Sequence, residues 1–186
     1  MIENGRRLRQ TVRVKRINLL ALLFAAALLA GCKNSQDAPP PPSNEMPLAT
    51  QAQAKLPTVK LYLGAEMLDA EQALTQREQM TGMMFRTNIQ DTDAMIFVFP
   101  RPMQAAFWMK NCPESISAAY IDPNGVIQEI HHLEKNDTNS VVAASADIQY
   151  VLETSDGWFD RHHVGIGALI RTEGGSLQET YFGNRQ

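Results

Sequence analysis

Four polar side chains in this 186-residue chain have the types and spacing that could hold a charged ligand. Lys110 and Asn111 are consecutive and follow an apolar segment, with Arg86 before them and Asp122 after them. Lysine and arginine offer positive charge to an acidic ligand group, and asparagine offers both a donor and an acceptor. Trp108 adds an apolar body with one N–H donor, which suits a pocket wall or a core position. These five residues are the predicted ligand-binding site.

The same polar residues can instead serve the fold. In that interpretation Asn111 bonds to the backbone, and either Lys110 or Arg86 pairs with Asp122. Cys112 lies beside Lys110, which could lower its thiol pKa. A nucleophile also needs an activating base and an orienting partner, and the sequence names neither. We therefore predict no catalytic residue, and we expect Cys112 to be a bystander thiol or to pair between molecules.

Two adjacent histidine pairs, at 131–132 and 162–163, raise the question of a metal site. Neighbours on a strand point to opposite faces, so each pair could lend only one ring to a site. One ring from each pair with Glu134 or Asp160 could bind zinc. We favour surface or hydrogen-bonded histidines, and we predict no metal and no cofactor.

The elements that must position these residues are mostly strands. Apolar and polar residues alternate at 59–63, and continuous apolar runs occupy 95–99 and much of 116–121. The turn Asp-Pro-Asn-Gly at 122–125 predicts a hairpin. Long helices do not separate the strands, which argues against a doubly wound parallel sheet. We predict a mainly β (α+β) fold: a small, mostly antiparallel curled sheet or barrel with one or two short helices.

One of those helices should begin after Thr75, because Glu78 stands at the spacing of a capping box. We expect this helix to run from Gln76 to Met84, with Met80, Met83 and Met84 on one side. Methionine commonly fills irregular gaps in a core, so these side chains are expected to pack rather than to bind metal.

The first 32 residues have the pattern of an export signal. Basic residues at 6–16 precede an apolar stretch at 17–30, and Leu-Ala-Gly-Cys occupies 29–32. The last four residues resemble the lipobox of bacterial lipoproteins. This resemblance implies removal of residues 1–31 and lipidation of Cys32. In such lipoproteins, an aspartate directly after the cysteine tends to retain the protein in the inner membrane. This chain has Lys33 at that position instead, which slightly favours the outer membrane.

Beyond the signal, the chain divides into three parts. Residues 32–55 include four consecutive prolines and read as a lipidated, proline-rich tether. Residues 56–172 form the β-rich domain, and residues 173–186 are expected to be a loose tail. The whole chain carries a net charge of −3, and residues 1–18 contribute +5, so the remainder carries −8. This balance argues against a nucleic-acid partner, since phosphate contacts need lysine and arginine.

The most distinctive segment of the domain is Phe-Trp-Met-Lys-Asn-Cys at 107–112. It is similar to the Phe-Trp-Met-Lys-Asn-Thr stretch of a prokaryotic family called domain of unknown function 192. Further matches are Gly-Met-Met-Phe-Arg at 82–86, Met-Ile-Phe-Val-Phe at 95–99, Tyr-Ile-Asp at 120–122 and Val-Leu-Glu at 151–153. The resemblance implies a compact, largely β fold and no agreed activity. Cys112 departs from the family's threonine, and Ser117 departs from its aspartate.

Together these features predict a cell-envelope lipoprotein that faces the periplasm or the exterior. We expect a non-catalytic binding or accessory module, attached to a membrane through its lipid. Its partner would be a small molecule, a glycan or an envelope protein. The alternative is an envelope hydrolase or a metal-assisted enzyme.

Overall fold

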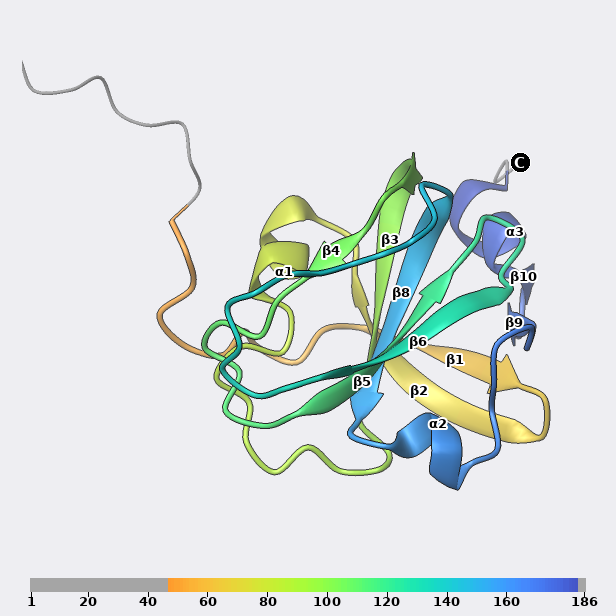
Figure 1. Cartoon of the computed structure of the whole chain (residues 1–186). Coiled ribbons are helices and arrows are strands. Elements are labelled where there is room, and N and C mark those ends of the chain that lie inside the picture. Colours follow the sequence, from red (N-terminus) through yellow and green to blue (C-terminus); the bar gives the residue numbers. More distant parts are fainter. Residues whose placement is uncertain (1–46, 184–186) are drawn as a thin grey trace, which may run out of the picture. The chain divides into compact units, whose positions relative to one another are not determined.

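A curled sheet of eight strands dominates the computed structural model, which describes residues 47–183 (Figure 1). The predicted signal, Cys32 and the four prolines lie outside these residues. The strand order is β10-β9-β1-β2-β3-β8-β5-β6; β2 and β3 are parallel, and every other neighbouring pair is antiparallel. The predicted fold class is confirmed. The strands of this sheet are β1 (Thr58–Leu63), β2 (Glu66–Ala73), β3 (Ala94–Met103), β5 (Ile116–Ile121), β6 (Ile127–Leu133), β8 (Ile148–Ser155), β9 (Ile170–Thr172) and β10 (Gly175–Ser176).

The sheet separates two apolar clusters, one on each face. Alternate residues of β3 face opposite clusters: Ile96 packs in one and Phe97 in the other. The same alternation divides Leu152 from Val151 on β8. The middle strands are therefore buried on both sides, which explains why their sequences are continuously apolar.

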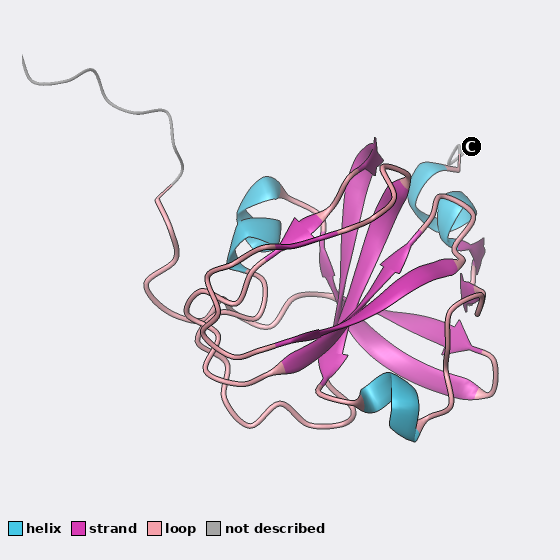
Figure 2. Cartoon of the chain, viewed as in Figure 1, coloured by secondary structure: helices cyan, strands magenta, loops and turns pink. Residues whose placement is uncertain are grey.

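Three short helices of the described residues lie around the sheet (Figure 2). They are α1 (Gln76–Thr81), α2 (Trp158–Arg161) and α3 (Leu177–Phe182). The capping box of Thr75 and Glu78 starts α1 as predicted, but the helix ends three residues before Met84. No helix within residues 47–183 has the length and apolar character needed to cross a membrane.

The predicted tether is docked over its final part, so its boundary at residue 55 is wrong. Leu48 and Ala49 pack against the core cluster that contains Phe97. The amide of Gln53 donates to the carbonyl oxygens of Glu78 and Gly82, at 3.2 and 2.9 Å. The last carbonyls of a helix lack partners within the helix, and Gln53 supplies one at the end of α1. Residues from Leu48 onward therefore pack with the domain.

The predicted loose tail is also ordered over its described part. Gly175–Ser176 pairs with β9, and Ser176 then caps α3 in a capping box with Glu179. Leu177 is fully buried in the same cluster as Trp158. The capping box was visible in the sequence as Ser176 followed three residues later by Glu179, and that signal supports a helix rather than a loose end.

A two-stranded ribbon, β4 (Ala106–Phe107) and β7 (Val141–Val142), lies beside the large sheet. The segment after β4 turns sharply at Lys110 and Asn111. The amide N–H of Cys112 donates to the carbonyl of Met109, which closes this turn. Together, α1, β3, β4 and this turn surround the candidate functional site.

Candidate functional site

Arg86 forms a buried ion pair with Glu71. Its two guanidinium nitrogens lie 2.6 and 2.8 Å from the two carboxylate oxygens. The Glu71 side chain is only 4% exposed. Burial works to raise the pKa of Glu71, but hydrogen bonds from Arg86 and from the backbone N–H of Leu56 outweigh it and lower that pKa. The predicted pairing of Arg86 with Asp122 is wrong, because Glu71 is the partner.

Trp108, Lys110 and Asn111 lie together on the turn after β4. The ammonium of Lys110 lies 5.3 Å from the centre of the Trp108 ring, a cation–π contact. Asn111 has a φ of 61°, in the left-handed region that asparagine tolerates better than most residues. Its carbonyl accepts the N–H of Phe85 at 2.7 Å, which ties this turn to the segment after α1.

Asp122 does not join this group. Asp122 directly follows the last residue of β5, whereas Cys112 lies shortly before the first residue of that strand. About 20 Å of extended strand separates the two ends. One carboxylate oxygen of Asp122 accepts the backbone N–H groups of Asn124 and Val126, both at 2.9 Å. Asp122 is therefore a turn residue that shapes the hairpin, and the predicted five-residue site is not a single site.

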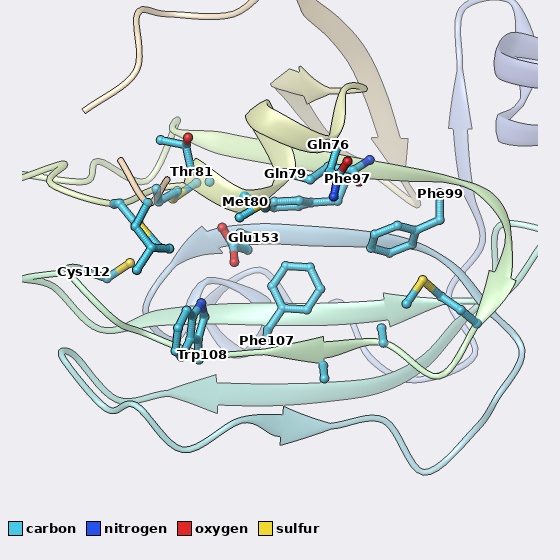
Figure 3. A pocket seen from close by; sticks show the side chains of 17 residues that line it. Gln76, Gln79, Met80, Thr81, Phe97, Phe99, Phe107, Trp108, Cys112 and Glu153 are labelled. Carbon is cyan, nitrogen blue, oxygen red and sulfur yellow. The ribbon is translucent and has the colours of Figure 1, made fainter. Parts of the chain in front are cut away.

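A cavity of about 250 Å³ opens beside Trp108 (Figure 3). This volume is slightly below the usual range of ligand pockets, about 300–1,000 Å³, so the cavity suits a small molecule. Figure 3 shows Glu153 within the cavity, with Met80 on one side and Phe107 and Trp108 on the other. Most of the lining is apolar and comes from α1, the segment after it, β3 and β4: Met80, Met83, Met84, Phe97, Phe99, Met103 and Phe107.

The aromatic side chains of the lining form one connected wall. The rings of Phe97 and Phe107 meet edge to face, with their centres 4.9 Å apart. Phe99 also meets Phe107 edge to face, at 6.5 Å. Phe107 comes from the small ribbon, whereas the other two come from the large sheet. The ribbon thus closes the cavity over one face of the sheet.

Among residues 47–183, Glu153 is the one acidic side chain in this lining, and it lies on a middle strand of the sheet. Its neighbours in register are Met95 on β3 and Ala118 on β5, neither of which has a polar side chain. Glu153 is 5% exposed. Its Oε2 atom has no hydrogen-bond partner among residues 47–183. Buried polar atoms of native proteins are rarely left without a partner, so this carboxyl needs an explanation.

Burial gives Glu153 an unusual acidity. It raises the pKa of this carboxyl from its ordinary value of 4.5 to about 8, and the positive charge of Arg86 offsets only part of the rise. At neutral pH the group is mostly a neutral acid that can donate a hydrogen bond. Burial, with a contribution from the charge of Glu153, also raises the pKa of Cys112 to about 12. Cys112 is a buried free thiol without the thiolate character of a nucleophile.

Three of the four histidines, His131, His132 and His162, lie within hydrogen-bond distance of carboxylates. His162 bonds to Asp91 at 2.7 Å and to Glu66 at 3.0 Å, and hydrogen bonding to Asp91 is the main cause that raises its pKa. His132 lies 2.7 Å from Asp156, and that bond is likewise the main cause that raises its pKa. Within residues 47–183, no three His, Cys, Asp or Glu side chains are grouped so as to hold a metal ion.

Glu153 is not among the predicted site residues, although the family resemblance includes Val-Leu-Glu at 151–153. The signal available was one acid at the end of the apolar run Tyr-Val-Leu at 150–152. An acid that follows an apolar run is ordinarily solvated, whereas Glu153 lies within β8 and is buried between its neighbours on β3 and β5. Of the predicted residues, Trp108 alone lines the cavity; Lys110 lies against Trp108, and Arg86 acts through Glu71.

The fold and the site define a β-rich domain with a small apolar pocket over a buried carboxyl. The chain belongs to the family DUF192, described as an uncharacterized ACR, whose family model matches residues 59–172. The expected family resemblance is thereby confirmed. No curated protein matches the chain at a significant level.

Two crystal structures are similar to this domain. One is a protein of unknown function from Novosphingobium aromaticivorans, with 26% identity and a TM-score of 0.60; the match covers 68% of this chain and 93% of that one. The other is described as a proposed transcription regulator from Sinorhizobium meliloti, with 24% identity and a TM-score of 0.57; the match covers 61% of this chain and 91% of that one. The second likeness supports the fold alone.

Proposed function

We propose that this chain is a lipid-anchored protein of the bacterial cell envelope whose domain binds a small molecule in the pocket over Glu153. The observation that carries the binding function is the unpartnered carboxyl oxygen at an apolar cavity. Leaving a buried polar group unpaired costs about 1–3 kcal/mol. Of the three buried side-chain atoms without a partner among residues 47–183, only Oε2 of Glu153 belongs to the lining of this cavity; the others are in Trp158 and Tyr181. A ligand that bonds to the Oε2 atom of Glu153 would supply the missing partner and offset this cost.

The size and chemistry of the cavity favour a small molecule over the other two partners that the sequence allows. A glycan or a protein surface would need a larger and more polar site than about 250 Å³ of mostly apolar lining. The described residues carry 9 basic and 17 acidic side chains, a net charge of −8, which disfavours nucleic acid.

Binding is a better account of this pocket than catalysis. Glu153 and Cys112 are the titratable side chains of its lining, and burial keeps the thiol of Cys112 neutral. General acid–base catalysis commonly needs an acid and a base with separate roles, and nucleophilic catalysis needs an activated nucleophile. The lining supplies neither arrangement. An envelope hydrolase is therefore the weaker proposal.

Occupancy of the pocket can be tested with two small probes, n-hexanol and n-hexylammonium, added to the full-length protein. At least one of them is expected to raise the melting temperature, by about 4 °C at ten times its Kd. Ala106→Trp, an exposed position that lines the pocket, should abolish this shift. Ala146→Trp, exposed and outside the lining, is the matched control and should retain it. Shifts that survive Ala106→Trp, or no shift with either probe, would contradict the binding function.

The lipid anchor rests on the export signal and on the Leu-Ala-Gly-Cys run at 29–32. In bacteria fed radiolabelled palmitate, the intact chain should carry label, and Cys32→Ser should carry none and keep its signal peptide. Cys112→Ser is the matched control and should label normally. Label that persists in Cys32→Ser would contradict the anchor. Fractionation of the labelled cells would then test the outer membrane, which Lys33 after the cysteine favours.

A further inference from the structure

We infer that the ligand of this pocket is a small organic cation, an amine with an apolar body, whose positive group pairs with the carboxylate of Glu153. The inference rests on the proposed binding function and assigns the chemical class of the ligand. It follows from the polar atoms that the pocket offers, from its aromatic wall and from its charge.

The polar side chains of the lining include one acidic group, Glu153, and two whose donors are already used, Gln79 and Thr81. The amide nitrogen of Gln79 already donates to the carbonyls of Ala73 and Val98, at 3.1 and 2.8 Å. The hydroxyl of Thr81 donates to the carbonyl of Arg77 at 2.9 Å. The Oε2 atom of Glu153 remains without a partner among residues 47–183. Among residues 47–183, the lining thus offers an anionic ligand no positive group, whereas a cation meets Glu153, which becomes a carboxylate when it releases its proton.

The wall of the pocket also suits a cation with an apolar body. Phe97, Phe99 and Phe107 present aromatic rings whose faces attract positive charge. Trp108 already holds one cation of the protein itself, the ammonium of Lys110 at 5.3 Å. Thioether groups from Met80 and its neighbours adapt to an irregular alkyl chain. The described domain is acidic, which draws cations toward it.

Binding of such a cation should release a proton from Glu153, whereas binding of a neutral ligand should not. Glu153 must give its proton to the buffer before it can pair with an ammonium group. Because burial raises its pKa to about 8, nearly one proton should be released on binding at pH 7. The other groups around Glu153 do not contribute: Arg86 and Glu71 are already charged, and burial raises the pKa values of Cys112 and Tyr120.

Calorimetry on the full-length protein tests the inference with three probes of matched length: n-hexylammonium, n-hexanol and hexanoate. At pH 8 we expect hexylammonium to bind at least 10-fold more tightly than hexanol, and hexanoate to bind more weakly than either. Titrations at pH 7 in two buffers of different ionisation enthalpy should show release of nearly one proton per hexylammonium bound. Glu153→Gln should remove both the preference and the proton release. Glu173→Gln, an exposed acid between β9 and β10, should keep both.

The outcomes separate this inference from the proposed function. Suppose that hexanol and hexylammonium bind equally well without proton release, and that Ala106→Trp still blocks both. That result would contradict a cationic ligand but would leave the proposed binding function in place. A preference for hexylammonium that persists in Glu153→Gln would also overturn the inference. Failure of every probe to bind would contradict the proposed function itself.

Discussion

Raising the pH from 5 to 9 is expected to lower the free energy of unfolding by about 4 kcal/mol through Glu153 alone. The folded protein keeps the proton on this carboxyl up to a pKa of about 8, whereas the unfolded chain releases it near 4.5. Between these values the folded state binds more protons than the unfolded state, so stability falls as the pH rises. Above pH 8 the full cost of a buried, unpaired carboxylate is present.

Other groups also titrate in this range, His132 and His162 among them, so the effect must be read as a difference between two proteins. Glu153→Gln keeps the shape of the side chain and removes its titration. Chemical denaturation should give the two proteins similar stability at pH 5 and a variant that is more stable by about 4 kcal/mol at pH 9. Parallel profiles across the range would show that Glu153 is not held as a neutral acid.

Arg86→Ala is expected to lower the free energy of unfolding by about 3 kcal/mol. The cost arises because the variant leaves the carboxylate of Glu71 buried with no cation, although Leu56 still donates to it at 2.7 Å. Equilibrium denaturation at pH 7 measures the effect. Arg101→Ala, an exposed arginine on β3, is the matched control and should change stability by less than about 0.5 kcal/mol.

A double variant distinguishes the lost pair from simple lost packing. Glu71→Gln combined with Arg86→Met removes both charges and keeps an acceptor for the N–H of Leu56. This variant should recover most of the lost stability, because replacing both partners of a buried pair is often close to neutral. If the double variant is as unstable as Arg86→Ala, the ion pair is not the cause. If Arg86→Ala is as stable as the unsubstituted chain, Arg86 is free to serve as a ligand anchor after all.

The sequence patterns were sufficient for the fold class and for most strands. Continuous apolar runs at 95–99 and in most of 116–121 identified strands that are buried on both faces. Thr75 and Glu78 correctly marked the start of α1. The boundaries failed where short polar segments are held by contacts from distant parts of the chain, as at Gln53, whose partners lie at the end of α1.

The site was harder to predict, because burial and pairing depend on which strands become neighbours. Arg86 finds Glu71 only because the segment after α1 folds back over β2. Glu153 becomes a buried acid only because β3 and β5 place Met95 and Ala118 beside it. Asp122 is different: the Asp-Pro-Asn-Gly sequence already indicated a turn, and that local role was the better interpretation.

The protonation of Glu153 in the empty pocket is the most direct test of this account. Carbon-13 NMR of the full-length protein labelled at glutamate side chains, with Glu153→Gln to assign the resonance, would follow this carboxyl through a pH titration. We expect a midpoint near pH 8, which falls when n-hexylammonium is added. A midpoint near 4.5 in the ligand-free protein would contradict a buried, unpaired carboxyl at the pocket and the ligand chemistry built on it.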